Sequence, residues 1–139
     1  MATTRRASAV WDGSLLEGSG QVTLESSGIG TFPVSWPARS AEPDGVTSPE
    51  ELIAAAHATC FSMALSNSLA KAGTPPTRLA TSAEVDFQPG TGITGIRLTV
   101  HGDVPGLDES GFRTAAESAK AACPVSRALS AVPITLTIE

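Results

Sequence analysis

Residues 48–65 read SPEELIAAAHATCFSMAL, and this stretch decides how the rest of the chain is interpreted. Ser48 is a favoured helix N-cap, Pro49 suits the first helical position, and Glu51 is spaced to close a capping box. The run of helix formers continues until a glycine and two prolines forbid further helix. The sequence therefore predicts a helix over residues 49–72, about 35 Å long, which must cross the core.

This helix contains the longest uncharged stretch of the chain, residues 52–70. Its length is close to the roughly 20 residues that span a bilayer. A histidine and several Ser, Thr and Asn side chains interrupt it, and alanine supplies much of the remainder, so its transfer into hydrocarbon is weakly favourable at best. We therefore expect a helix that protein buries on most sides, and no membrane partner.

Shorter runs with β-type alternation flank this helix on both sides. Glycine-separated runs before it predict an antiparallel meander, and two runs around a Pro-Gly-Thr-Gly turn after it predict a hairpin. The predicted strands cover residues 7–11, 21–25, 30–36, 80–87, 93–100 and 134–138. Residues 39–46 are predicted as a loop, and Asp108 and Pro124 are predicted to start two further helices. The expected fold class is α+β.

Composition narrows the function classes. The chain has 139 residues, 41% of them hydrophobic, which predicts a single domain over residues 1–139 with a substantial core. A net charge of −5 disfavours nucleic acid and anionic membranes as partners, since both need a positive surface. The N-terminal residues lack the apolar run of a signal peptide, so we expect a cytoplasmic protein.

The chain has two cysteines, Cys60 and Cys123. A structural disulfide is not expected in the cytosol, so each is either an inert core thiol or a reactive group. Cys60 lies in the middle of the predicted helix among small residues. Cys123 directly precedes Pro124, where the N–H groups of a helix start favour a thiolate. Whether the two sulfurs meet depends on the fold.

The residues also allow a metal interpretation. His57 and His101 complete the inventory of a Cys2His2 zinc site with the two cysteines, and His57 lies one helical turn from Cys60. The other two candidates lack the close spacing of such sites, so no metal is expected. The simpler interpretation of His57 is a core histidine that hydrogen-bonds to a backbone carbonyl or a serine.

Three charged residues lie near the helix start. The capping box accounts for Glu51. Glu50 has no part in the capping box, and its negative charge interacts favourably with the dipole at the helix N-terminus. Arg39 is the nearest upstream cation, in a segment that is otherwise acidic, and a solvated role is the default for such an arginine.

Taken together, residues 48–65 and the segment ACPVS at 122–126 resemble the OsmC branch of the OsmC/Ohr hydroperoxide reductases. The resemblance extends over nearly the whole chain. It implies an OsmC/Ohr-like α+β fold, an antiparallel sheet with a long central helix, and an intertwined homodimer with active sites at the interface. The family's functional residues fall on Cys60 as the peroxide-attacking cysteine, Cys123 as the resolving cysteine, and Arg39 with Glu50 as the assisting pair.

The resemblance implies a peroxiredoxin-like peroxidase of oxidative or osmotic stress defence. It would reduce organic hydroperoxides, and possibly hydrogen peroxide, through a sulfenic acid on Cys60 and a disulfide with Cys123, with an external thiol or dithiol as reductant and no cofactor. Apolar neighbours such as Phe61 and Met63 would favour organic substrates. The alternative is a non-catalytic dimeric stress or ligand-binding protein with two buried thiols.

Two positions depart from the family pattern. The Ohr branch has its assisting arginine near the N-terminus, where this chain has Arg5 and Arg6, so these compete with Arg39 for the role. Thr59 stands where alanine is common and adds a hydroxyl beside Cys60.

Overall fold

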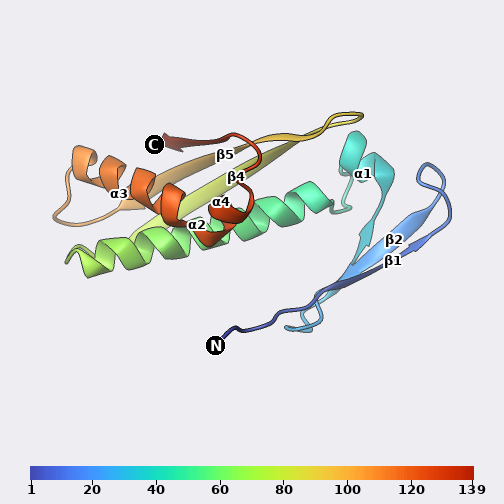
Figure 1. Cartoon of the computed structure of the whole chain (residues 1–139), viewed down its shortest axis with the longest axis horizontal. Coiled ribbons are helices and arrows are strands. Elements are labelled where there is room, and N and C mark those ends of the chain that lie inside the picture. The colour runs from blue at the N-terminus through green and yellow to red at the C-terminus, as the bar shows by residue number, and fades with distance from the viewer. The chain divides into compact units, whose positions relative to one another are not determined.

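The computed structural model describes residues 1–139 and has a mixed α and β architecture, which confirms the predicted fold class (Figure 1). The chain forms two compact units, Met1–Glu50 and Glu51–Glu139. That the two units make one domain over residues 1–139 remains a prediction.

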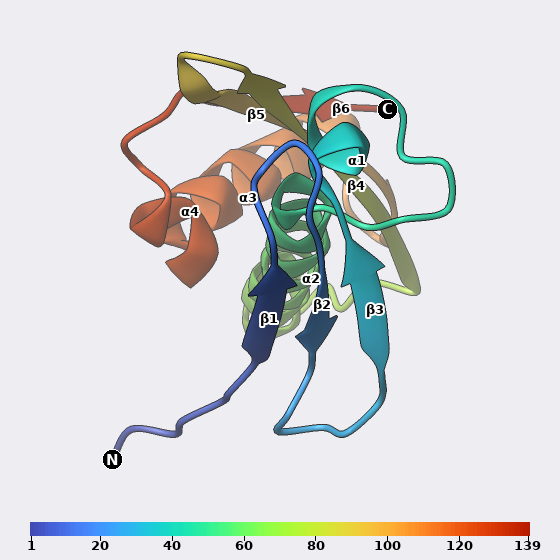
Figure 2. The same cartoon turned by 90° about the vertical axis from the view of Figure 1, so that its right-hand side faces the viewer.

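The first unit begins with the predicted antiparallel meander, in which β1 (Ser8–Asp12), β2 (Ser19–Thr23) and β3 (Thr31–Val34) pair in that order (Figure 2). The last strand is shorter than predicted because a helix, α1 (Trp36–Ser40), follows it. The hydroxyl of Ser35 caps this helix by accepting a 3.3 Å hydrogen bond from an amide of the first turn.

The prediction of a loop from residue 39 is therefore wrong at its start. Arg39 lies in the last turn of α1, not in irregular chain. The β-type alternation predicted a strand up to residue 36, but Ser35 and Pro37 start a helix there. Proline is compatible with the first turn of a helix, since the amides there have no intrahelical partner.

The β1–β3 sheet leaves most of its surface uncovered within the chain. Every residue of β1 is exposed, and the other two strands alternate only partly. The large hydrophobic side chains that the first unit exposes are Val10, Trp11, Leu15, Leu16, Ile29 and Phe32, in addition to the initiator methionine. A small sheet of this kind needs a covering layer for stability.

The helix predicted from residue 49 is observed as α2 (Pro49–Lys71). One stripe of it is fully buried, formed by residues four apart: His57, Phe61, Leu65 and Leu69. The expectation of burial on most sides is wrong for the single chain, because the opposite side includes Met63 at 67% exposure. By length and composition α2 could cross a membrane, a criterion that core helices of soluble proteins also meet.

The second unit contains the remaining elements. β4 (Arg78–Gln88) and β5 (Gly92–Asp103) form the predicted hairpin, and β6 (Ile134–Ile138) joins the other edge of β5 in parallel. The connection to β6 contains α3 (Glu109–Ala122) and α4 (Pro124–Ala128). Asp108 caps α3, as predicted, by accepting a 2.7 Å hydrogen bond from the Gly111 amide.

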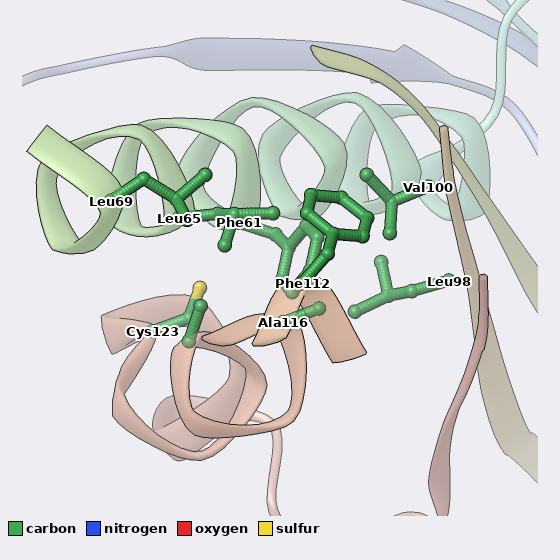
Figure 3. Close-up of a cluster of buried hydrophobic side chains, with 9 residues drawn as sticks. Phe61, Leu65, Leu69, Leu98, Val100, Phe112, Ala116 and Cys123 are labelled. Carbon is green, nitrogen blue, oxygen red and sulfur yellow. The ribbon is translucent and has the colours of Figure 1, made fainter. Parts of the chain in front are cut away.

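The core of the second unit is formed by side chains of α2, α3 and β5 (Figure 3). The buried stripe of α2 contributes three apolar residues to it, and α3 contributes Phe112, Ala116 and Ala119. Cys123 is a member of this cluster. The core therefore holds one of the two sulfurs in place against the central helix.

Candidate active site

The fold brings the two cysteines together. Cys60 lies in the middle of α2, and Cys123 lies between α3 and α4. Each of the two thiols alters the pKa of the other, so the two side chains are neighbours. Cys60 is half-buried, whereas Cys123 is completely buried, and both are free thiols. A small molecule from solvent can therefore reach the first sulfur and not the second.

Pro124 explains why the chain turns at Cys123. A residue before proline is disfavoured in helical conformation, and Cys123 has φ −56° and ψ 124°, outside the helical region. α3 ends at that point, and α4 begins with Pro124 in its first turn. The turn directs the Cys123 side chain inward, toward α2 (Figure 3).

The two thiols have different electrostatic environments. Burial raises the pKa of the Cys60 thiol, the neighbouring Cys123 raises it further, and the Val125 amide opposes them. Burial also acts to raise the pKa of Cys123. Contacts with the Ser126 amide, Cys60, the Ser126 hydroxyl and the Val125 amide outweigh it, so the pKa of Cys123 is lowered overall. None of these contacts is a regular capping bond at the start of α4.

His57 lies one helical turn before Cys60 on α2 and is fully buried. Its Nε2 is 2.7 Å from Oγ of Ser126, which is itself 6% exposed. Burial lowers the pKa of His57, so the ring is neutral at pH 7. This confirms the interpretation of His57 as a core histidine paired with a serine.

Arg39 and Glu50 form a bidentate ion pair within the first unit. Nε of Arg39 donates to both carboxylate oxygens of Glu50, at 3.0 and 3.1 Å, and Nη2 donates to one of them at 3.0 Å. Glu50 is only 6% exposed. This fork geometry fixes the plane of the guanidinium.

The competing arginines have no comparable placement. Arg5 is exposed and donates to the neighbouring Thr4 carbonyl, and the side chain of Arg6 is also exposed. Thr59 donates its hydroxyl to the Ala55 carbonyl at 2.7 Å, so this group is engaged by the helix backbone. Phe61 packs in the core and does not line an open surface beside Cys60, contrary to expectation.

The four residues of the zinc interpretation do not form one cluster. His101 is exposed on β5, where its Nδ1 is 3.0 Å from the main-chain oxygen of Glu139. The structure contains no group of three or more His, Cys, Asp or Glu side chains that could hold a metal ion.

Val125 and Ser126 belong to the segment that resembles the family, but no role was predicted for them. Both lie in the first turn of α4, directly after Cys123. The third residue of a helix turns its amide and side chain back toward the N-cap, and this spacing could have identified Ser126.

Comparisons with known proteins agree on one family. The family described as OsmC-like protein matches residues 42–139. Peroxiredoxin OsmC from Escherichia coli K12 is 42% identical over 142 residues, covering 100% of this chain and 98% of the relative, and the protein of that name from Shigella flexneri matches equally.

Solved structures give the same result for the fold. An organic hydroperoxide resistance protein OsmC from Legionella pneumophila has a TM-score of 0.74 at 23% identity, covering 99% of each chain. OhrB of Bacillus subtilis has a TM-score of 0.69 at 23% identity and covers 96% of this chain and 98% of its own. The resemblance inferred from the two cysteine segments is thus confirmed: the chain belongs to the OsmC family.

Proposed function

We propose that this protein is a thiol peroxidase of stress defence that reduces organic hydroperoxides with two cysteines. The observation that carries the proposal is that the fold makes a half-buried Cys60 and a fully buried Cys123 neighbours, although 63 positions of sequence separate them. Its 42% identical relative is named a peroxiredoxin, which supports the same chemistry. Cys60 is the reachable sulfur, so it takes the role of attacking the peroxide.

In the oxidation step the Cys60 thiolate attacks one peroxide oxygen and the O–O bond breaks. The alcohol leaves with the proton that the alkoxide requires, and the sulfur becomes a sulfenic acid. Met63 lies three residues further along α2, on the side of the helix that Cys60 shares, and exposes an apolar thioether. This surface favours the carbon chain of an organic hydroperoxide over hydrogen peroxide.

A cation is required because the surroundings of Cys60 in the second unit raise its pKa. Full ionisation of an ordinary thiol would gain only about thirtyfold in thiolate at pH 7, and the raised pKa of Cys60 makes this gain larger. The cation has a second task, because the peroxide must be oriented and the departing alkoxide stabilised. We assign this task to Arg39, whose guanidinium Glu50 holds in a fixed plane.

In the resolution step Cys123 attacks the sulfenic sulfur of Cys60, and the hydroxyl group leaves as water. The Cys60–Cys123 disulfide then exchanges with an external thiol or dithiol, which returns both thiols. We place this cycle in the cytoplasm, where thiol reductants maintain a reducing potential.

We propose that the working protein is a homodimer. Two apolar surfaces support this: the uncovered β1–β3 sheet, and the side of α2 that includes Met63. Patches of this kind on a small protein indicate an interface. A second copy of the chain would cover both and would bring an Arg39–Glu50 pair to a cysteine pair.

The test of the peroxidase uses single-turnover reactions with one equivalent of cumene hydroperoxide. Cys60→Ser abolishes peroxide consumption, whereas Cys123→Ser consumes one equivalent and leaves a sulfenic acid that dimedone traps. Mass spectrometry of the quenched protein reads both outcomes. Full consumption by Cys60→Ser would show that Cys60 is not the nucleophile, and thiols that survive the peroxide would favour the non-catalytic protein.

Mixed dimers test the origin of the cation. Arg39→Ala slows oxidation of Cys60, and Arg39→Lys restores it only partly because lysine lacks the planar fork. Variants Cys60→Ser and Arg39→Ala are then mixed and allowed to exchange subunits. If the arginine acts across the interface, half of the sites in mixed dimers recover activity. If it acts within one chain, no activity returns, and if Arg39→Ala is as fast as the original, Arg5 or Arg6 takes the role.

A further inference from the structure

The peroxidase chemistry uses two cysteines, an arginine and a glutamate, and leaves His57 without a task. This histidine is fully buried in α2, and its Nε2 lies 2.7 Å from Oγ of Ser126. Its Nδ1 is buried with no hydrogen-bond partner. A buried ring nitrogen without a hydrogen-bond partner costs free energy of folding. The buried pair of His57 and Ser126 therefore needs an explanation.

The unpaired nitrogen indicates which tautomer the ring adopts. If Nδ1 carried the proton, a buried N–H donor would have no acceptor, and orphaned donors are rarer than orphaned acceptors. With the proton on Nε2, the group without a partner is the lone pair of Nδ1, which is an acceptor. His57 then donates to Oγ of Ser126.

This tautomer fixes the direction of the next hydrogen bond. Because the Ser126 oxygen accepts from His57, its own proton is free to point to another acceptor. Ser126 lies three residues after Cys123, in the first turn of α4, and its hydroxyl lowers the pKa of the Cys123 thiol. The ring of His57 is thus hydrogen-bonded to a hydroxyl that acts on the Cys123 sulfur.

We propose that His57 and Ser126 are positioning residues for the resolving cysteine. The ring orients the serine hydroxyl, and the hydroxyl stabilises the Cys123 thiolate and orients it toward the Cys60 sulfur. The inference rests on the two-cysteine peroxidase proposed above and extends it to the resolution step. Neither residue touches the peroxide.

The step balances without another reactant. The Cys123 thiolate attacks the Cys60 sulfur, the S–S bond forms, and the S–O bond of the sulfenic acid breaks. The sulfenic sulfur is reduced and the Cys123 sulfur is oxidised, and the departing hydroxide takes the proton that Cys123 released. The serine hydroxyl keeps its proton throughout.

Within the second unit, no charged side chain acts on the Cys123 thiol, and the Arg39 guanidinium assigned to Cys60 above is the same in every variant compared below. Its contacts are Cys60 from α2 and the Val125 and Ser126 groups of α4. On α3, the ammonium of Lys120 is directed to the Ile134 carbonyl and the Glu117 carboxylate. The remaining nearby cation, on residue 127 of α4, is exposed. A change at Ser126 is therefore read directly in the Cys123 thiol.

Three variants and one control test the inference. Ser126→Ala removes the donor, His57→Leu removes the group that orients it, and His57→Gln keeps an N–H at about the reach of Nε2. The control is Ser62→Ala, because Ser62 donates to the Ala58 carbonyl and pairs with Thr81 at 2.8 Å, and so loses similar hydrogen bonds with no sulfur involved. Circular dichroism verifies that each variant is folded.

The first readout is the pH dependence of disulfide formation after one equivalent of cumene hydroperoxide, followed by rapid quenching and mass spectrometry. Ser126→Ala shifts the inflection up by about one pH unit, the value of one hydrogen bond to a charged group. Well below the inflection, the rate of disulfide formation falls about threefold. The fraction of Cys123 present as thiolate is smaller, but a thiolate with a higher pKa is a stronger nucleophile and partly offsets this loss. The high-pH plateau is not reduced. The inflection of His57→Leu shifts in the same direction. His57→Gln and Ser62→Ala keep the inflection of the unmodified protein.

The second readout is thiolate absorbance of Cys123 in the Cys60→Ser background, with and without Ser126→Ala. An unchanged inflection in both readouts, or a plateau that falls together with the low-pH rate, would overturn the inference and leave the peroxidase intact. Failure of the unmodified protein to oxidise Cys60 would instead refute the peroxidase. In that case the absorbance titration still decides whether Ser126 acts on the thiol.

Discussion

The ion pair between Arg39 and Glu50, which we propose assists Cys60, has a strength that follows from its geometry and burial. Replacing Arg39 with alanine leaves a carboxylate at 8% side-chain exposure without the guanidinium that makes three hydrogen bonds to it. Replacing Glu50 with glutamine removes the charge and keeps the shape. The two changes together form a double-mutant cycle that isolates the pair from the other contacts of each residue.

The expected cost follows from geometry and burial. Breaking a fully buried pair costs about 3–5 kcal/mol, because one charge stays buried and uncompensated. Exposed pairs are worth about 0–1 kcal/mol. The side chain of Arg39 is 32% exposed, so solvent screens part of the interaction. We expect Arg39→Ala to destabilise by about 2–3 kcal/mol and the coupling energy to be about 1.5–2 kcal/mol.

The sequence provides a local probe for this measurement. The chain has two tryptophans and no tyrosine, and Trp11 and Trp36 both lie in the first unit with the ion pair. Urea unfolding followed by tryptophan emission therefore reports on that unit. Circular dichroism at 222 nm reports chiefly on the helices of the second unit, so the two signals separate a local from a general loss of stability.

An exposed ion pair supplies the control. Arg97 pairs with Glu84 and Asp86 on the β4–β5 hairpin, and the three side chains are between 46% and 66% exposed. Arg97→Ala is expected to cost less than about 1 kcal/mol. A coupling energy below about 0.5 kcal/mol for Arg39 and Glu50 would refute the argument that burial and fork geometry preorganise the guanidinium.

Two further predictions concern the second unit. The pKa of His57 is lowered by burial, so the unfolded chain binds a proton near pH 6.5 that the folded chain does not. Stability should therefore be constant above this pH and fall below it by up to about 1.4 kcal/mol per pH unit, and His57→Gln should flatten the slope in urea unfolding between pH 5 and 8. At Gly102, an added Cβ would lie 2.4 Å from Cζ of Phe112, so Gly102→Ala should cost about 1–3 kcal/mol by urea unfolding. Gly95→Ala on the same strand meets only the Pro133 oxygen at 3.6 Å and should cost less than about 0.5 kcal/mol; equal effects would contradict the packing argument.

The helix start at Pro49 and the final strand at Ile134 were correctly predicted from sequence because their causes are local. A cap, a proline at the first turn and a two-residue alternation act within a few residues of chain. The cap of α1 is equally local. α1 was not predicted because this cap, Ser35, stands where the strand was expected to continue. The parallel pairing of β6 with β5 was not predicted, since pairing partners are set by the chain path and not by alternation.

The sequence by itself indicated the residues that we propose for the chemistry, Cys60, Cys123, Arg39 and Glu50, because their functional groups are local properties of the chain and two of its segments resemble one family. Only the tertiary structure decided that one sulfur is reachable and the other buried, and that His57 meets Ser126 across 69 positions of chain. These are properties of packing between elements far apart in sequence. Burial and distance arise when α2, α3 and α4 close on one core, and no local pattern encodes them.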